Sequence, residues 1–501
     1  MGYTQGSRVL MLGIDAGDVN IIRSSLDTLP RLRQLFADGP VSKLQSSAAL
    51  TSSVWPTFST GTPPGQHGSY YPMQWDPAAM TLRRVAADWI DYEPFWYALA
   101  RQGKHITTLD VPFSLPSRLE RGVEVQNWGS QECLGPFGSN RPELAREIRK
   151  RFGEHPMGSD VPIEEPAHKL ELLRNNLVAG ARRKGELARW LMETTRWDLF
   201  ITVFAECHRG GHTLQPGSRP AAVPPNALSE VYQAVDRAIG HILDGVDRET
   251  TTIVVFSVHG MRANLTQEHF VLPLMERINA TFETGGMGSA ATAPEVKSNP
   301  MRILRAAIPP RLQYGIAKAV PAGARDWVVR RAYCGGLDWK KTLGFALPGS
   351  GEGYLRYNMA GREMQGSLQR GSERHQRYEK WLTDSLLSFK DARTHAPIVK
   401  EVVFAHDAYP GPRSGYLPDA IILWNDLMPA QEIYSDRLGR LSASLTTGRT
   451  GEHQPEGFAV VAGDRRGLEE APRLEHASDF AGLVRHLLHR TGSTRTSATS
   501  V

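Results

Sequence analysis

Short apolar runs alternate with helix-length amphipathic segments over the first half of the chain. Four runs have the length of buried strands and are each followed by polar residues: Val9–Ile14, Ile106–Asp110, Leu199–Phe204 and Thr252–Ser257. Helix-period segments lie between them, at Glu143–Phe152, Lys184–Thr194 and Leu228–Leu243. This alternation predicts an α/β fold in which helices sandwich a mostly parallel central sheet. Because ligands of such sheets bind outside the carboxyl ends of the strands, the polar residues at those ends are candidates for function.

The alternation of strand and helix patterns becomes weaker between about residues 265 and 400. Residues 301–357 hold ten Lys or Arg against three acidic residues, so the net charge of this segment, +7, exceeds the +5 of the whole chain. The segment is either a solvated basic face or part of a cap that attracts an anionic substrate. The strand pattern resumes near Ala420–Trp424 and Phe458–Ala462. We therefore expect a first part of the catalytic core at 1–264, a cap or insert at 265–400, a second part of the core at 401–490 and a disordered tail at 491–501.

Composition excludes several classes of protein. The 501 residues are 41% hydrophobic and 22% charged, which supports a large core and excludes disordered, collagen-like and coiled-coil chains. A net charge of +5 over this length is too small to indicate a nucleic-acid polymer as partner. No apolar stretch approaches the roughly 20 residues that a membrane-spanning helix needs, although a basic amphipathic helix at Met301–Val320 is a minor alternative for membrane attachment. Three distant cysteines cannot form a disulfide framework, so we expect a soluble, cytoplasmic protein. The sequence does not determine its oligomeric state.

One aspartate and four histidines stand beside the expected strands. Asp15 follows the first strand in GIDAGD, where a carboxylate either binds a metal or caps the next helix. His208 and His212 are four residues apart in ECHRGGH, so on a helix both imidazoles face the same side and can share a metal ion. His259 in SVHGM and His453 in GEHQPEG flank two further strands. One such histidine is more often a core residue, but the five together favour a metal site.

Hydroxyl residues gather in LTSSVWPTFSTGTPPGQHG, at residues 50–68. Serine and threonine before a helix usually cap it. A nucleophilic role requires a group that deprotonates the hydroxyl, and a metal ion bound to it would do so.

Taken in order, these motifs resemble the type I phosphodiesterase/nucleotide pyrophosphatase family of the alkaline phosphatase superfamily. The matching segments are GIDAGD, TSSVWPTFSTGTPPGQHG, ECHRGGH, SVHGM and RTGEHQPEG, which span residues 13–463. LRYNMAGREMQG (355–366) and PDAIILWND (418–426) resemble a subgroup of predicted phosphohydrolases or phosphomutases. The resemblance implies an alkaline-phosphatase-like fold and a metal-dependent hydrolase that cleaves a phosphodiester, pyrophosphate or related phosphoester of an anionic small molecule.

The resemblance also implies roles for individual residues. Thr51, nine residues before the threonine of the Thr60–Gly61 pair, takes the position of the family's nucleophile and would form a covalent phosphothreonine. The implied metal ions are zinc, with manganese or iron as alternatives, one held by His208, His212 and His453 and a second by Asp15, Thr51 and His259. The candidate substrate-binding residues are His67, Asn264 and Arg362.

Two positions depart from the family pattern. His208 stands where the family usually has Asp, which makes the first site all-imidazole and favours zinc over magnesium. Val258 stands where an Asp usually precedes the histidine, which removes a ligand and leaves open whether one or two ions bind; Asp18 and Glu206 are the conceivable substitutes.

Two alternative functions remain open. A phosphoryl or sulfuryl transferase, or a phosphomutase, would use the same fold, although no C-x-P-x-R or S-x-P-x-R sulfatase motif lies near residue 51. A catalytically inactive metal- or anion-binding protein is the alternative of another class. The presence of Thr51, His212, His259 and His453 at their motif positions favours an active enzyme.

Overall fold

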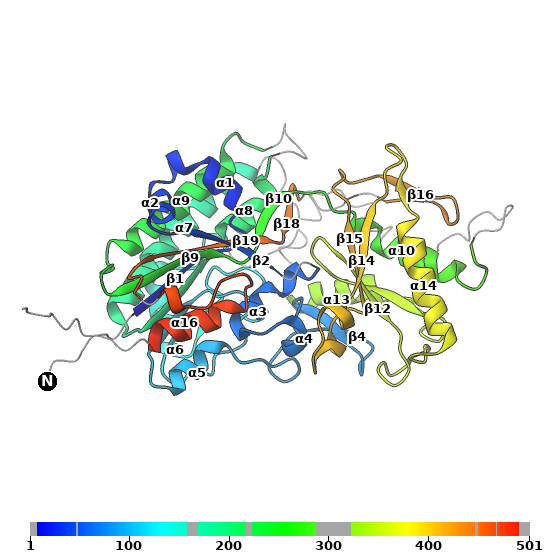
Figure 1. Ribbon diagram of the computed structural model, residues 1–501, viewed down its shortest axis with the longest axis horizontal. Helices are drawn as coiled ribbons and strands as arrows, with labels where there is room; N and C mark the ends of the chain where they lie inside the picture. The colour runs from blue at the N-terminus through cyan, green and yellow to red at the C-terminus, as the bar shows by residue number, and fades with distance from the viewer. Residues whose placement is uncertain are drawn as a thin grey trace, which may run out of the picture.

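The computed structural model describes residues 8–46, 49–157, 169–216, 223–286, 322–443, 445, 449–466 and 468–489. These residues form two parts that lie side by side along the long axis of the molecule, one around a large sheet and one around smaller antiparallel sheets (Figure 1). The expected tail at 491–501 and the basic stretch Met301–Val320 lie outside the described residues. No helix within the described ranges has the length and apolar character needed to cross a membrane.

The larger part is built on an eight-stranded, mainly parallel sheet. Its strands are, in spatial order, β2 (Val41–Gln45), β19 (Glu456–Gly463), β9 (Thr251–Ser257), β1 (Arg8–Ile14), β8 (Leu199–Phe204), β5 (Ile106–Leu109), β6 (Gly122–Gln126) and β7 (Gly138–Ser139). The five neighbours from β9 to β6 run parallel, whereas β19 and β7 pair antiparallel. All four strands predicted from apolar runs belong to the parallel block, so the predicted sheet is confirmed.

Helices cover both faces of this sheet. One layer contains α1 (Val19–Ser24), α2 (Pro30–Asp38), α6 (Pro142–Phe152), α7 (Leu170–Thr194), α8 (Glu206–Leu214) and α9 (Ala227–Leu243). The other contains α3 (Val54–Thr60), α5 (Phe95–Arg101) and α16 (Asp479–His489). The predicted helices lie in α6, α7 and α9, with α7 beginning 14 residues before the segment that the periodicity indicated.

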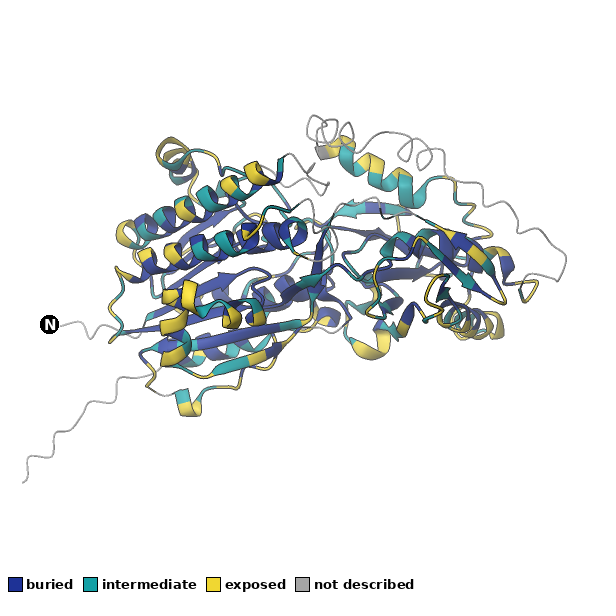
Figure 2. Ribbon diagram, turned by 90° about the horizontal axis from the view of Figure 1, so that it is seen from above, coloured by how far each residue is buried: buried dark blue, intermediate teal, exposed yellow. Residues whose placement is uncertain are grey.

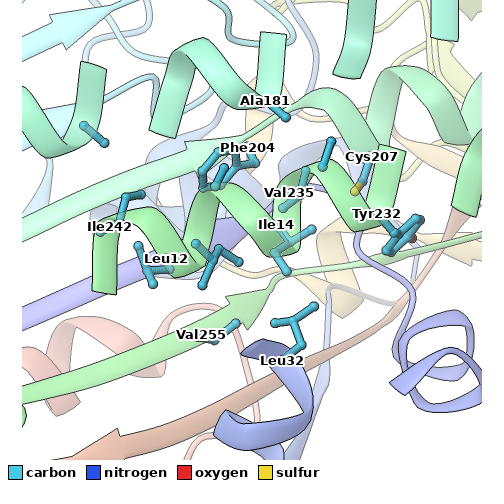
Figure 3. Packing of buried hydrophobic residues seen from close by; sticks show 14 of the residues in the cluster. Leu12, Ile14, Leu32, Ala181, Phe204, Cys207, Tyr232, Val235, Ile242 and Val255 are labelled. Carbon is cyan, nitrogen blue, oxygen red and sulfur yellow. The ribbon is translucent and has the colours of Figure 1, made fainter. Parts of the chain in front are cut away.

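Strand β1 shows why its sequence is apolar throughout. Leu10, Leu12 and Ile14 belong to the apolar cluster under α7 and α9, whereas Val9 and Met11 belong to the cluster under α3 and α16. Successive side chains of a strand point to opposite faces, so a strand covered on both faces needs apolar residues at every position. Figure 3 shows the packing of the first cluster, and Figure 2 shows the buried strands between helices whose outer sides are exposed.

The smaller part is built on a four-stranded antiparallel sheet. Its strands are, in spatial order, β11 (Gly344–Leu347), β12 (Gly353–Tyr357), β15 (Ala420–Trp424) and β14 (Val399–Phe404). One face packs against α10 (Val271–Thr281) and α14 (Glu373–Leu387), and the other against α13 (Ala322–Cys334) and the hairpin of β3 (Met73–Asp76) and β4 (Thr81–Arg84). The apolar run at Ala420–Trp424 thus lies in this sheet, and the chain returns to the central sheet at β19.

The remaining helices and strands of the described residues are short. They are the sheet of β13 (Lys390–Asp391), β16 (Glu432–Ser435) and β17 (Gly439–Ser442), the pair β10 (Gly260–Ala263) and β18 (Gly451–Gln454), helices α4 (Pro64–His67) and α15 (Ala405–Ala408), and the 3₁₀ turns η1 (Leu26–Thr28), η2 (Thr51–Ser53), η4 (Glu268–Phe270), η5 (Ser414–Tyr416) and η6 (Leu468–Glu470). The antiparallel register of β10 and β18 sets His453 opposite Met261. This pairing carries His453 to the edge of the sheet where β9 ends.

Candidate active site

Neighbouring strands bring four of the predicted residues to one edge of the central sheet. Asp15 directly follows β1, and its backbone N–H donates to the carbonyl of Phe204 at the end of β8 at 2.9 Å. The chain then enters α8, which carries His208 and His212. On the other side of β1, His259 follows the end of β9 by two residues. Since β8, β1 and β9 are parallel neighbours, their carboxyl ends meet at this edge.

His208, His212 and His453 form one group. The Nε2 atom of His208 lies 3.0 Å from Nε2 of His212 and 2.8 Å from Nε2 of His453. His212 Nδ1 lies 2.9 Å from the carbonyl oxygen of Gly451 and donates to it, so the lone pair of the neutral ring is on Nε2. The three residues are placed so that each offers a ring nitrogen to a common point.

Asp15, His208 and His259 form a second group. Asp15 Oδ2 lies 2.6 Å from Nδ1 of His208, and Oδ1 lies 3.3 Å from Nε2 of His259. Oδ1 also accepts a hydrogen bond of 2.8 Å from the indole Nε1 of Trp55. His259 Nδ1 lies 3.1 Å from the Gly260 carbonyl oxygen.

Burial sets the protonation states of these groups. Burial alone would raise the pKa of Asp15, but the charges and hydrogen bonds of His208 and His259 outweigh it and hold the pKa well below the usual range. Burial lowers the pKa of His212 and of His453 far below that of a free histidine, and the nearby charge of Arg449 adds to the shift at both. The site therefore holds an ionised Asp15 carboxylate and neutral imidazoles at His212 and His453, which is the state in which these side chains bind metals.

The donor set fits a zinc-like ion. The Nε2 atoms of His212 and of His453 converge on the Nε2 atom of His208, and all three side chains are buried. Buried acceptors that face one another are satisfied by a cation between them. The carbonyl that accepts from His212 Nδ1 is the kind of outer partner that fixes a metal-bound histidine. An all-imidazole set of this kind suits zinc better than magnesium.

Thr51 lies on the turn that leads into α3. Its side chain is buried, and Trp55, four residues later in α3, donates through its indole to Asp15. The hydroxyl of Thr51 donates to Oε1 of Glu352, and the hydroxyl of Tyr354 donates to Oε2 at 3.1 Å. Burial raises the pKa of Glu352, although the hydrogen bond from Thr51 opposes the shift.

Glu352 is the site residue that the sequence did not reveal. It stands just before β12, in the smaller part of the molecule, and no motif marks it. The one signal was its rarity, since it is one of three acidic residues in the basic segment 301–357.

The family model described as type I phosphodiesterase/nucleotide pyrophosphatase matches residues 9–309, more than half of the chain. This chain belongs to the type I phosphodiesterase/nucleotide pyrophosphatase family. No curated protein sequence matches it.

Solved structures share the fold of this phosphodiesterase-family chain. The phosphonoacetate hydrolase of Sinorhizobium meliloti 1021, in complex with phosphonoacetate, is 15% identical with a TM-score of 0.51, and the alignment covers 96% of each chain. Murine ectonucleotide pyrophosphatase/phosphodiesterase 5 is 12% identical with a TM-score of 0.47, covering 97% of this chain and 95% of its own. The hydrolase confirms the predicted alkaline-phosphatase-like fold. The family match makes this chain a phosphoester hydrolase.

His208 and Val258, the two positions that differ from the family pattern, lie in different surroundings. His208 joins both groups, with one ring nitrogen in each. Val258 is fully buried in the apolar cluster on the α3 and α16 side of the sheet. Neither suggested substitute ligand contacts Asp15 in the described structure: Asp18 caps α1, and Glu206 lies 3.0 Å from His155 Nε2.

His67 is the last residue of the short helix α4, which follows α3. Its Nδ1 accepts from the backbone N–H of Ser69 at 3.1 Å, and its Nε2 lies 3.1 Å from the hydroxyl of Thr57, to which it donates. Burial, with a contribution from the charge of Arg413, lowers the pKa of His67 to about 3. Both ring nitrogens therefore hold this segment in place.

Asn264 and Arg362 also bind other parts of the chain. The amide of Asn264 donates to the carbonyl of Arg449 at 3.1 Å and its oxygen accepts from the N–H of Thr266 at 3.1 Å. Arg362 makes a two-pronged ion pair with Asp419, at 2.6 and 2.7 Å. The side-chain hydrogen bonds of both residues within the described chain go to residues outside the two histidine-containing groups.

Proposed function

We propose that this protein is a metal-dependent hydrolase that cleaves a phosphodiester, pyrophosphate or related phosphoester through a covalent intermediate on Thr51. The convergence of ring nitrogens from His208, His212 and His453, at 2.8 and 3.0 Å, carries this proposal. Trp55, four residues after Thr51 in the chain, donates to Asp15, and the other carboxylate oxygen of Asp15 lies 2.6 Å from His208 of that group.

The first half-reaction transfers the phosphoryl group to Thr51. The Oγ atom attacks phosphorus, the Oγ–P bond forms, and the leaving-group oxygen departs with the electron pair of the broken P–O bond. The hydroxyl proton leaves along the hydrogen bond to Glu352, which orients Oγ before the attack. A bound zinc-like ion would supply positive charge that lowers the pKa of the attacking hydroxyl and neutralises the phosphoryl oxygens.

The second half-reaction restores the enzyme. Water attacks phosphorus, the Oγ–P bond breaks, and Thr51 regains its proton. Glu352 again lies beside the oxygen that gains the proton, and Tyr354 holds the carboxylate in position through its 3.1 Å hydrogen bond.

The proposal is tested by comparing wild type with Thr51→Ala and with Ser59→Ala, a control that removes a buried hydroxyl at the end of α3. Elemental analysis measures bound metal, and hydrolysis is measured on bis(p-nitrophenyl) phosphate and p-nitrophenyl phosphate. We expect metal in all three proteins and a loss of hydrolysis of about a thousandfold or more in Thr51→Ala alone. Acid-quenched wild type should carry a phosphothreonine at residue 51 by mass spectrometry.

Three results would overturn the proposal. Absence of metal would remove the proposed chemistry. Full activity in Thr51→Ala would remove the nucleophile. Metal without hydrolysis of any phosphoester would favour a transferase or a binding protein.

A further inference from the structure

Arg449 lies in the loop that leads into β18 and the histidine group. The backbone N–H of Thr450 donates to the carbonyl of His212 at 2.8 Å, and the N–H of Asn264 donates to the carbonyl of Thr450 at 2.8 Å. The side-chain amide of Asn264 donates a hydrogen bond to the backbone carbonyl of Arg449. These bonds fix the base of the Arg449 side chain beside a metal-group histidine.

The guanidinium of Arg449 lacks an ion pair within the described part of the chain. Its side chain is half-buried, and Nη1 donates to Oγ of Ser350 at 3.3 Å. No described carboxylate oxygen lies within 4.0 Å of it. Arg262, by contrast, is paired with Asp426 at 2.6 Å. Since a guanidinium presents several N–H donors, Arg449 keeps donors that one hydroxyl cannot satisfy.

One tripeptide connects Arg449 to the nucleophile. Ser350 contacts Arg449, and Glu352, two residues later, accepts from the Thr51 hydroxyl. Two residues of extended chain span at most about 7 Å. The loop of Arg449 is thus bonded to the His212 backbone through Thr450, and the Arg449 side chain is bonded to the segment that carries Glu352, the partner of Thr51.

We propose that Arg449 binds an anionic, non-bridging oxygen of the phosphoryl group that is attacked by Thr51. This inference rests on the proposed function and deepens it by naming the substrate class. The site selects phosphate and phosphonate esters with at least one ionised oxygen on phosphorus, and it discriminates against neutral triesters. Arginine suits this role because its planar fork of N–H groups matches the oxygens of a phosphoryl group.

The test uses metal-loaded wild type, Arg449→Met, Arg449→Lys and Arg485→Met. Arg485 is an exposed arginine of α16, so its variant controls for the loss of one positive charge. Isothermal titration calorimetry measures the Kd of inorganic phosphate, elemental analysis measures metal content, and kcat/KM is measured on bis(p-nitrophenyl) phosphate and on a neutral p-nitrophenyl phosphotriester.

We expect Arg449→Met to weaken phosphate binding by about 10- to 100-fold, with unchanged metal content. Arg449→Lys keeps the charge without the fork and should fall between Arg449→Met and wild type. Arg485→Met should match wild type. The preference for the anionic diester over the triester should shrink in Arg449→Met.

The outcomes separate this inference from the proposed function. Wild-type phosphate affinity in Arg449→Met would overturn the role of Arg449 while leaving the hydrolase proposal intact. Loss of metal together with phosphate binding would also overturn it, because Arg449 would then act through the metal group. If wild type hydrolyses no ester but binds phosphate through Arg449, the anion site stands and the proposed hydrolase fails.

Discussion

The Nδ1 atom of His208 lies 2.6 Å from Oδ2 of Asp15, while Nε2 of the same ring faces His212 and His453. A neutral imidazole has one lone pair, and when Nδ1 donates to a carboxylate that lone pair is on Nε2. Asp15 therefore orients His208 toward the three-histidine group, in the manner of an outer carboxylate that supports a metal-bound histidine. In this state the His208 ring can bind one metal ion, through Nε2.

We accordingly expect about one tightly bound ion per chain. Val258 contributes no ligand from the apolar cluster that it occupies, so the second group depends on Asp15, the carboxylate that also orients His208. Elemental analysis after gel filtration measures the stoichiometry. Two ions per chain at neutral pH would contradict the assignment of Asp15 to orienting His208.

Removal of metal should lower thermal stability. Without an ion, the ring nitrogens of the three histidines face one another in a buried site, whereas zinc at a thousandfold excess over its Kd stabilises the fold by about 4 kcal/mol. Differential scanning fluorimetry with zinc and with a chelator measures the difference in Tm. The same zinc-dependent shift in His453→Ala would show that the ion binds elsewhere.

Glu352→Gln should slow hydrolysis by about 10- to 100-fold without loss of metal. The variant removes the charge that accepts the hydrogen bond of the Thr51 hydroxyl, and hydrogen bonds to charged groups have this magnitude. Tyr354→Phe, which removes a bond to the other carboxylate oxygen, should cause a smaller loss. Steady-state kinetics and elemental analysis test both, and unchanged kcat/KM in Glu352→Gln would refute the orienting role.

His67 should make stability depend on pH. Its pKa is about 3 in the fold against 6.5 for the free group, so below pH 6.5 the unfolded chain takes up the proton more readily. Its contribution to the free energy of unfolding is thus complete above pH 6.5 and is lost between pH 6.5 and 3, by at most about 1.4 kcal/mol per pH unit.

Urea unfolding of wild type and His67→Gln at pH 7, 6 and 5 measures this effect. The variant should be less stable at pH 7, because it loses the bonds to Thr57 and Ser69, but its stability should fall less steeply with acid. Parallel pH profiles would assign the acid sensitivity to other groups.

Arg362→Gln should lower stability rather than substrate affinity. The substitution leaves the largely buried Asp419 without its two-pronged partner, which costs about 3–5 kcal/mol when a buried pair is broken. Denaturant unfolding and KM on bis(p-nitrophenyl) phosphate separate the two roles. An increased KM with unchanged unfolding would support the substrate-binding role predicted from the sequence.

The sequence predicts those parts of the molecule that local patterns encode. The apolar run at Leu199–Phe204 and the four-residue spacing of His208 and His212 suffice to place two histidines at a strand end. The contact of Glu352 with Thr51 joins residues 301 positions apart, and it depends on how the smaller sheet sits against the larger one. The spacing of hydrophobic residues along the chain does not indicate how the two sheets pack against each other. The ion pair of Arg362 was hidden for the same reason, because its partner lies 57 positions away.

The distance along the chain between parts of the centre has a consequence for synthesis. His453 follows His208 by 245 residues, and the strand pair that carries it to the sheet edge forms only when β18 exists. The parallel strands β1, β8 and β9 are all translated long before that point. A nascent chain on the ribosome can therefore assemble the sheet edge while the metal group is incomplete, so phosphoester cleavage begins only when translation has passed residue 453.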